Sequence, residues 1–212
     1  MGQDKLWAEV CGRPLVAHTL AATAAAGVFD RVVVATPGHN WEPLRALATT
    51  LGLGGTLELV AGGRRRQDSV RLALDSCGEA EIIVVHDAAR PLCPPALFGD
   101  VITAARRHGA ATSAIPLVDS VKRVDGEGRV TATLERSELV AVQTPQAFDT
   151  ALLREAHRRA QAEGVDADDD CALVERLGAP VVVVPGDPRN LKVTRPQDLA
   201  LMRALLDEAV AT

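Results

Sequence analysis

The chain has 212 residues, 47% of them hydrophobic, with a formal net charge of -5 and a sequence pI near 5.5. This size predicts one globular domain with a substantial core, and the acidic balance gives no indication of a nucleic-acid-binding surface. Neither an apolar run of about 18 residues nor an apolar N-terminal segment occurs, so we expect no membrane span and no signal peptide.

Helical and strand-like segments alternate along most of the chain. In chain order, the expected helices are 14–27, 42–52, 66–78, 94–109, 149–164, 168–178 and 195–210. The expected strands are 29–37, 57–63, 81–91, 110–118 and 180–186, and we expect the first of them to be buried. Short apolar strands between helices indicate βαβ units, and therefore an α/β fold with a mostly parallel sheet and helices on both of its faces.

Two features depart from this alternation. Residues 118–148 contain strand-like runs on either side of DGEG, a hairpin signal, and we expect a β-arm projecting from the sheet at about 119–143. In addition, no strand is expected before the first helix. The first strand of such a sheet is normally central and leads into the ligand-binding turn, so its absence is unusual.

Ligands of open α/β sheets bind at the carboxyl ends of the strands, and charged segments lie there. In GGRRRQDSV (62–70), glycines, arginines and a helix start at Asp68 and Ser69 could bind an anion. The alternative is an ordinary solvated cap. In HDAARP (86–91), Asp87 could hold Mg²⁺ and Arg90 a phosphate, or the two could be a local ion pair. We expect His86 to be packed on the other face of its strand.

Two further segments contribute charges. GDPRNLKVTRP (186–196) forms an irregular loop that brings Lys192 near the edge of the sheet where Asp87 lies, although a lone lysine is usually solvated. DADDDCALVE offers acids that could cap a helix, with Asp169 as a weak site candidate. An acid, cations and an anion-binding turn on one rim suit transfer of a phosphorus centre.

Other chemistries find no support in the sequence. No Walker loop occurs, no GxGxxG follows a strand, and no Ser-His-Asp or Cys-His arrangement is indicated. The cysteines form no CxxC pair, which favours reduced thiols in a cytoplasmic protein over disulfides or a zinc site.

The motifs DKLW, GGRRRQDSV, HDAARP, TPQAF and NLKVTRPQDL, in this order, resemble the 2-C-methyl-D-erythritol 4-phosphate cytidylyltransferase family of the non-mevalonate isoprenoid pathway. The resemblance covers essentially the whole chain. It implies a Rossmann-like nucleotidyltransferase, one domain over 1–212, whose arm pairs two subunits into a homodimer. It also implies that CTP and 2-C-methyl-D-erythritol 4-phosphate are joined with release of pyrophosphate, using Mg²⁺.

The resemblance further assigns roles by motif position. Lys5 and Lys192 would be catalytic, neutralising the transition state, and Asp87 would orient the metal and the substrate. The nucleotide would be bound by Gly63, Arg64, Ser69, Asp87 and Ala88. The acceptor would be bound by Asp87, Arg90, Ser120, Arg136, Thr144 and Lys192, with Ser120 and Arg136 reaching a neighbouring subunit's site from the arm.

One departure from the family pattern concerns the N-terminus. Family members begin with a strand and a turn of the form AAGxGxRMG that cradles the triphosphate, and here Met1-Gly2 is similar to the end of that motif. We expect that this strand and turn are missing from the sequence. A non-catalytic nucleotide-binding module therefore stays open as an alternative. A ribitol-5-phosphate cytidylyltransferase stays open as well, because such enzymes look similar throughout.

Overall fold

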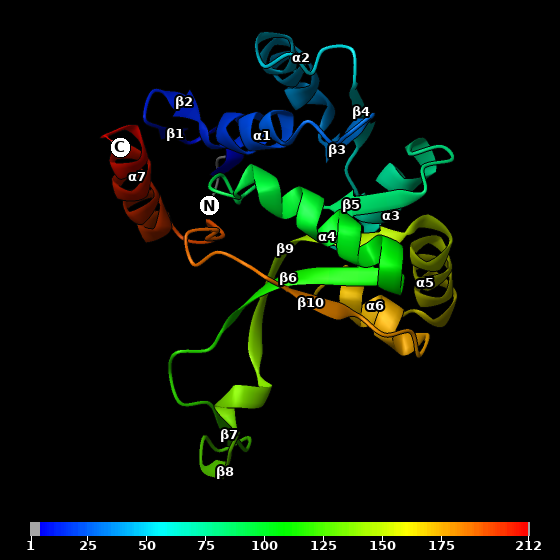
Figure 1. Ribbon diagram of the computed structural model, residues 1–212, viewed down its shortest axis with the longest axis vertical. Coiled ribbons are helices and arrows are strands. Elements are labelled where there is room, and N and C mark those ends of the chain that lie inside the picture. The colour runs from blue at the N-terminus through cyan, green and yellow to red at the C-terminus, as the bar shows by residue number, and fades with distance from the viewer. Residues whose placement is uncertain (1–4, 212) are drawn as a thin grey trace.

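The computed structural model describes residues 5–211, with side chains for residues 5–206, as an α/β fold from which a β-hairpin arm projects (Figure 1). Its helices are α1 (Leu15–Ala26), α2 (Trp41–Thr50), α3 (Arg66–Ser76), α4 (Pro95–His108), α5 (Thr150–Glu163), α6 (Asp170–Arg176) and α7 (Pro196–Ala211). Its 3-10 helices are η1 (Lys5–Trp7), η2 (Gly38–Asn40) and η3 (Arg136–Glu138). Its strands are β1 (Glu9–Val10), β2 (Arg13–Pro14), β3 (Val32–Thr36), β4 (Leu57–Ala61), β5 (Ile82–Val85), β6 (Ala110–Pro116), β7 (Lys122–Val124), β8 (Val130–Thr133), β9 (Val140–Asp149) and β10 (Val182–Pro185).

The α/β class is confirmed, but the sheet is less parallel than the sequence predicts. Strands β10 and β6 pair in parallel, as do β3 and β4, whereas β9 runs antiparallel to both β5 and β6. The reason is the arm. Strand β6 leads out toward the hairpin and β9 brings the chain back beside it, so these two strands must run in opposite directions.

No ladder of backbone hydrogen bonds joins the main sheet to strands β3 and β4 among the described residues. The main sheet has the order β10-β6-β9-β5, and β3 pairs with β4 in a separate two-stranded sheet. The expectation that 29–37 is a buried strand is therefore wrong in part, because Val32, Val33 and Val34 are only half-buried. A strand of this composition in a parallel sheet is normally covered on both faces.

A small ribbon precedes α1, which corrects the expectation that no strand lies there. Strands β1 and β2 pair antiparallel through a two-residue turn at Cys11 and Gly12, whose φ angles are 46° and 73°. Positive φ at both central residues is typical of a type I′ hairpin turn. Each strand has two residues, too few to show an alternating pattern in the sequence.

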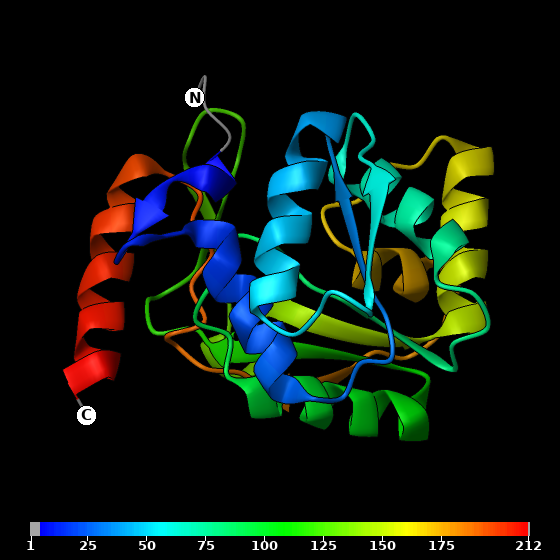
Figure 2. The same cartoon turned by 90° about the horizontal axis from the view of Figure 1, so that it is seen from above.

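Helices cover both faces of the main sheet (Figures 1 and 2). On one face, α5 and α6 bury Leu153 and Val174 against Phe148 of β9, and all three side chains are fully inaccessible to solvent. On the other face, α4 places Val101 and Ala105 on small residues of the sheet, which let the helix approach closely. Helix α1 ends at Gly27, which has the left-handed conformation expected of a C-terminal glycine.

The predicted hairpin forms the arm, which carries little packing of its own. Strands β7 and β8 pair antiparallel, and the Asp125 carboxylate accepts the backbone N–H groups of Glu127 and Arg129 in the turn between them. Val118, Val124 and Val130 are exposed large apolar side chains in this region. In the part of the chain that the structure describes, no helix is long and apolar enough to span a membrane.

Candidate functional site

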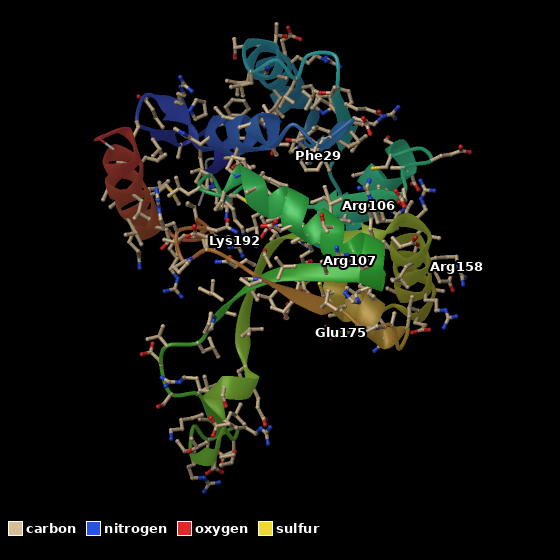
Figure 3. The ribbon with its side chains drawn as sticks, in the orientation of Figure 1. Phe29, Arg106, Arg107, Arg158, Glu175 and Lys192 are labelled. Carbon is tan, nitrogen blue, oxygen red and sulfur yellow. The ribbon has the colours of Figure 1, made fainter. Side chains whose placement is uncertain are left out.

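Three of the charged segments singled out in the sequence meet at Asp87, directly after β5. The Asp87 Oδ2 atom lies 2.9 Å from Lys192 Nζ and 3.4 Å from Arg90 Nε. Its Oδ1 atom accepts a 3.1 Å hydrogen bond from Arg66 Nε, at the start of α3. Figure 3 shows Lys192 on the segment between β10 and α7. The prediction that Lys192 lies near the edge where Asp87 ends its strand is confirmed.

The cations around Asp87 determine its ionisation. Burial by itself would raise the pKa of this carboxyl group, but the charges and hydrogen bonds of Lys192 and Arg66 outweigh burial and lower the pKa to about 2. Asp87 is therefore ionised at neutral pH, with three cationic side chains against one carboxylate. Arg90 experiences the opposite balance, because its burial lowers its pKa more than Asp87 raises it.

Backbone contacts fix the loops that carry these side chains. Arg90 is buried, and its Nη1 atom donates a 2.7 Å hydrogen bond to the carbonyl of Asn190. The N–H of Val193 donates to the carbonyl of Ala89, and Lys5 Nζ donates to the carbonyl of Val193 at 2.9 Å. Lys5, from the start of the chain, is thus brought beside the segment that carries Lys192.

The turn before α3 is built tightly from Gly63 to Ser69. The N–H of Gly63 donates to Ser69 Oγ at 3.0 Å. A Cβ at Gly63 would lie 2.3 Å from the Cβ of Asp68, so no larger residue fits without displacing the backbone. The Asp68 carboxylate accepts the backbone N–H and side-chain N–H groups of Arg65 at the start of α3. An ordinary cap is therefore present, beside the hydrogen bond that joins Gly63 to Ser69.

Two smaller candidates are also drawn into the cluster. Thr144, from β9, is buried, and its hydroxyl accepts the N–H of Asp87 at 2.9 Å. The carbonyl of Ala88 accepts the Thr19 hydroxyl at 2.8 Å. Both contacts orient the loop after β5. These hydrogen bonds within the protein therefore place Ala88 and Thr144 at the cluster.

Three sequence candidates stay apart from the cluster in this single chain. Arg64 is exposed in the turn before α3. Ser120 and Arg136 are exposed on the arm, which extends away from the sheet (Figure 1). Arg136 Nη1 donates to the carbonyl of Val118 within the arm.

Two interpretations that assign a residue a structural role are confirmed. His86 is half-buried beside Phe98, with ring centroids 5.0 Å apart, and desolvation lowers the pKa of its imidazole to about 4. Asp169 is the N-cap of α6, where its Oδ1 atom accepts the N–H of Ala172. Neither contact requires a ligand.

Sequence reasoning missed residues that the structure places at the centre. It treated the three consecutive arginines alike, whereas Arg66 alone pairs with Asp87, and it did not single out Asp170 or Asn190. Asp170 is buried and accepts hydrogen bonds from Arg66 and His157. The only signal in the sequence was the acidic run that contains Asp170, which does not show which of its acids faces inward.

The donor set at Asp87 fits a hard cation that brings other ligands with it. Among the described residues, no group of three His, Cys, Asp or Glu side chains could form a metal site on its own. A carboxylate has about four lone-pair positions, of which Arg66 and Lys192 occupy two here, whereas Arg90 Nε at 3.4 Å makes an ion pair only. Mg²⁺ is usually held by one or two carboxylates together with substrate phosphates and water, so one ionised acid is sufficient.

An ionised strand-end carboxylate, clustered cations and a glycine turn on the rim of this α/β sheet define a nucleotidyltransferase. A sequence model of the 2-C-methyl-D-erythritol 4-phosphate cytidylyltransferase family matches residues 1–208. The chain belongs to this family, and it is therefore a cytidylyltransferase.

Individual relatives agree with this placement. The chain is 45% identical over 208 residues to 2-C-methyl-D-erythritol 4-phosphate cytidylyltransferase of Nocardia farcinica, covering 98% of this chain and 87% of the relative. It is also 45% identical over 216 residues to the bifunctional enzyme IspD/IspF of Anaeromyxobacter sp. (strain Fw109-5), covering 99% of this chain but only 55% of that enzyme.

Solved structures show the same fold. The crystal structure of 2-C-methyl-D-erythritol 4-phosphate cytidylyltransferase from Thermus thermophilus has a TM-score of 0.81 at 38% identity, covering 96% of this chain and 94% of that one. The 4-diphosphocytidyl-2C-methyl-D-erythritolsynthase from Anaerococcus prevotii has a TM-score of 0.89 at 27% identity, covering 95% and 93%.

Proposed function

We propose that the enzyme transfers the cytidylyl group of CTP to 2-C-methyl-D-erythritol 4-phosphate, giving 4-diphosphocytidyl-2-C-methyl-D-erythritol and pyrophosphate. The observation that carries this proposal is the meeting of Asp87, Lys192 and Arg66 at one rim of the sheet. An oxygen of the acceptor phosphate attacks the α-phosphorus of CTP. The new P–O bond forms as the bond from the α-phosphorus to pyrophosphate breaks, and pyrophosphate leaves with the negative charge. Catalysis then consists mainly of positioning and charge neutralisation.

Mg²⁺ is the proposed cofactor, and Asp87 is the residue that would hold it. When bound, the ion would neutralise phosphate charge and help to align the two reacting groups. The low pKa of Asp87 keeps its carboxylate ionised across the physiological range. Its remaining lone pairs are the protein's contribution to the coordination shell.

Lys192 is the cation best suited to act on the substrate. Its side chain is 39% exposed, whereas that of Arg90 is 10% exposed. The lysine can therefore turn from Asp87 to a phosphate, while the buried arginine keeps the loops in place. Lys5 would contribute a second ammonium group from the neighbouring η1 segment, where its contact with the Val193 carbonyl already places it. Arg90 would act on the acceptor mainly by holding Asp87 and Asn190.

The cytosine would be bound at the turn before α3. Gly63 presents backbone at close range, because no side chain intervenes, and the Ser69 hydroxyl lies against it. The backbone of Arg64 lies between them in the chain. Polar backbone groups and a hydroxyl can read the edge of a base, and Ala88 leaves space near the ribose.

The acceptor site would be completed by a second copy of the chain. Ser120 and Arg136 are exposed residues of the arm, and the arm extends away from the main sheet (Figure 1). The exposed valines of the arm, including Val118 and Val130, are an apolar surface of the kind that pairs subunits. A homodimer in which Arg136 of the partner subunit binds the acceptor phosphate accounts for both features. Thr144 would support the same site from β9.

The test is an assay of pyrophosphate release from CTP and Mg²⁺ with two acceptors side by side. Turnover with 2-C-methyl-D-erythritol 4-phosphate, faster than with ribitol 5-phosphate, is the expected result. Faster turnover of ribitol 5-phosphate would reassign the acceptor. Binding of CTP without release of pyrophosphate from either acceptor would instead favour the non-catalytic nucleotide-binding module.

A further inference from the structure

We propose that Arg66 and Asp170 are positioning residues that fix the orientation of Asp87 and keep its carboxylate available to a cation. This inference rests on the proposed function, which assigns Asp87 to the metal and the substrate. Neither residue needs to touch a substrate for this role. Both act through Asp87, from the first residues of helices α3 and α6.

The arginine bridges two carboxylates with two different nitrogens. Arg66 Nε donates to Asp87 Oδ1 at 3.1 Å, and Arg66 Nη1 donates to Asp170 Oδ2 at 2.8 Å. The guanidinium is a rigid planar fork, so anchoring one nitrogen determines where the other points. A lysine, with a single charged nitrogen, could not reproduce this bridge. The position of Asp170 therefore helps to determine the position of Asp87.

Asp170 is itself held from a second side. Its side chain is 1% exposed, and its Oδ1 atom accepts a 2.9 Å hydrogen bond from Nε2 of the buried His157 on α5. The neighbouring Cys171 and Leu173 belong to the main hydrophobic core. A carboxylate enclosed in this way, with both oxygens bonded, has no alternative orientation.

The two helix starts that carry Arg66 and Asp170 are also tied to each other. The buried Gln67 donates from Nε2 to the carbonyl of Val165, and its Oε1 atom accepts the N–H of Ala167. These bonds join the start of α3 to the segment before α6. The bridge between Arg66 and Asp170 is therefore supported by backbone and does not depend on one ion pair.

The charges give this bridge a function beyond orientation. Asp87 lies against Arg66, Arg90 and Lys192, which together could saturate its carboxylate. Asp170 shares the charge of Arg66 through its 2.8 Å contact with Nη1. Without the Asp170 charge, Arg66 would pair with Asp87 alone and compete with a bound cation. Asp170 thus weakens the ion pair between Arg66 and Asp87.

The main variants are Asp170→Asn and Arg66→Lys. The asparagine keeps the size of the side chain and can still accept from Arg66 while donating to the other tautomer of His157, so it removes charge with little loss of hydrogen bonding. The matched control is Glu175→Gln, the same change on the same helix, at the opposite end of the sheet from Lys192 (Figure 3). Arg66 has 31% exposure, which keeps its variant foldable if Asp170→Asn unfolds.

Two readouts test the inference. The first is kinetic: kcat, the KM for CTP and the Mg²⁺ concentration that gives a half-maximal rate are measured for each variant. The second is binding of Mn²⁺, as the probe ion, to the enzyme with CTP and no acceptor, followed by electron paramagnetic resonance. Outer-shell partners of metal ligands typically contribute about 10–100-fold, so we expect losses of that size in Mn²⁺ affinity and in kcat, with a smaller change in KM. The control should match the wild type.

The outcomes separate the two proposals. If the wild type turns over and both folded variants match it in Mn²⁺ affinity and kcat, the positioning role is wrong while the proposed function stands. If the variants lose thermal stability but keep the wild-type Mn²⁺ affinity, Asp170 is merely structural and the inference is overturned. A wild type that neither binds Mn²⁺ with CTP nor releases pyrophosphate overturns the proposed function, and this inference with it.

Discussion

The cluster around Asp87 and the arm are built on opposite principles. In the cluster, charged side chains from three parts of the chain pair with one another, and Lys5 joins them through the carbonyl of Val193. In the arm, a short hairpin exposes its apolar side chains, with Val118 82% exposed. Most contacts of the cluster are made within one chain, whereas the described part of the chain offers the arm little surface to pack against.

This difference indicates which kind of partner each region needs. The cluster has an excess of positive charge around one carboxylate, which suits a polyanion such as a triphosphate with its metal. The arm has no such excess of positive charge. It exposes valines, which suit packing against the surface of another protein chain. The two regions together therefore support the proposal of a small anionic ligand at the cluster and a second copy of the chain at the arm.

The largest expected effect comes from removing the central charge of the cluster. Asp87→Asn should lower kcat by more than about 100-fold, the upper range of losses seen when even an outer-shell partner of a metal ligand is removed. The comparison is Asp125→Asn, which changes the carboxylate of the arm's turn. Steady-state rates of pyrophosphate release measure both. Equal losses in the two variants would contradict the functional contrast between cluster and arm.

The next test joins the two regions in one experiment. Lys192→Ala should lower kcat with a smaller change in KM, because its proposed contact forms with the transition state. Arg136→Ala should weaken use of the acceptor. If the arm completes its partner's site, mixing these two variants produces mixed dimers with one intact site, and activity should recover to about a quarter of the wild-type value after random exchange of subunits. No recovery would mean that each site is built from one chain.

A smaller effect concerns pH and the half-buried imidazole beside the cluster. His86 has its pKa lowered by burial from an ordinary value of 6.5 to about 4, so the unfolded chain binds more protons than the folded one between these values. The free energy of unfolding should therefore fall as pH is lowered from 6.5 toward 4, by up to roughly 1.4 kcal/mol per pH unit. His86→Gln should flatten this dependence, as measured by denaturant melts. An unchanged slope would assign the pH dependence to other groups.

The smallest expected effect is on the stability of the arm. Val118→Ser removes an apolar side chain that is largely exposed in the single chain, and the free energy of unfolding of the monomer should change by less than about 0.5 kcal/mol. Dimerisation, measured by analytical ultracentrifugation, should weaken. A strong loss of monomer stability with unchanged association would show that this valine packs within its own chain.

The sequence predicted the elements of the fold well, because their signals are local. Helix periodicity, the glycine at the end of α1 and the DGEG turn of the arm depend on residues that are close along the chain. The ribbon at Cys11 and Gly12 was missed, since its strands are too short to show a pattern. The half-burial of β3 was missed as well, because it depends on which strands lie beside it.

For the site, the sequence by itself determined that Asp87 and Lys192 belong near one edge, because charged loops that follow parallel strands meet there. Only the tertiary structure decided which arginine of three reaches Asp87 and which acid of the run before α6 faces inward. Those choices depend on the relative placement of α3, α5 and α6, elements up to about a hundred residues apart along the chain, whose packing is long-range and leaves no local pattern. The packed core therefore decides whether Arg66 contacts Asp170. The motif HDAARP, in contrast, already places an acid at the end of its strand.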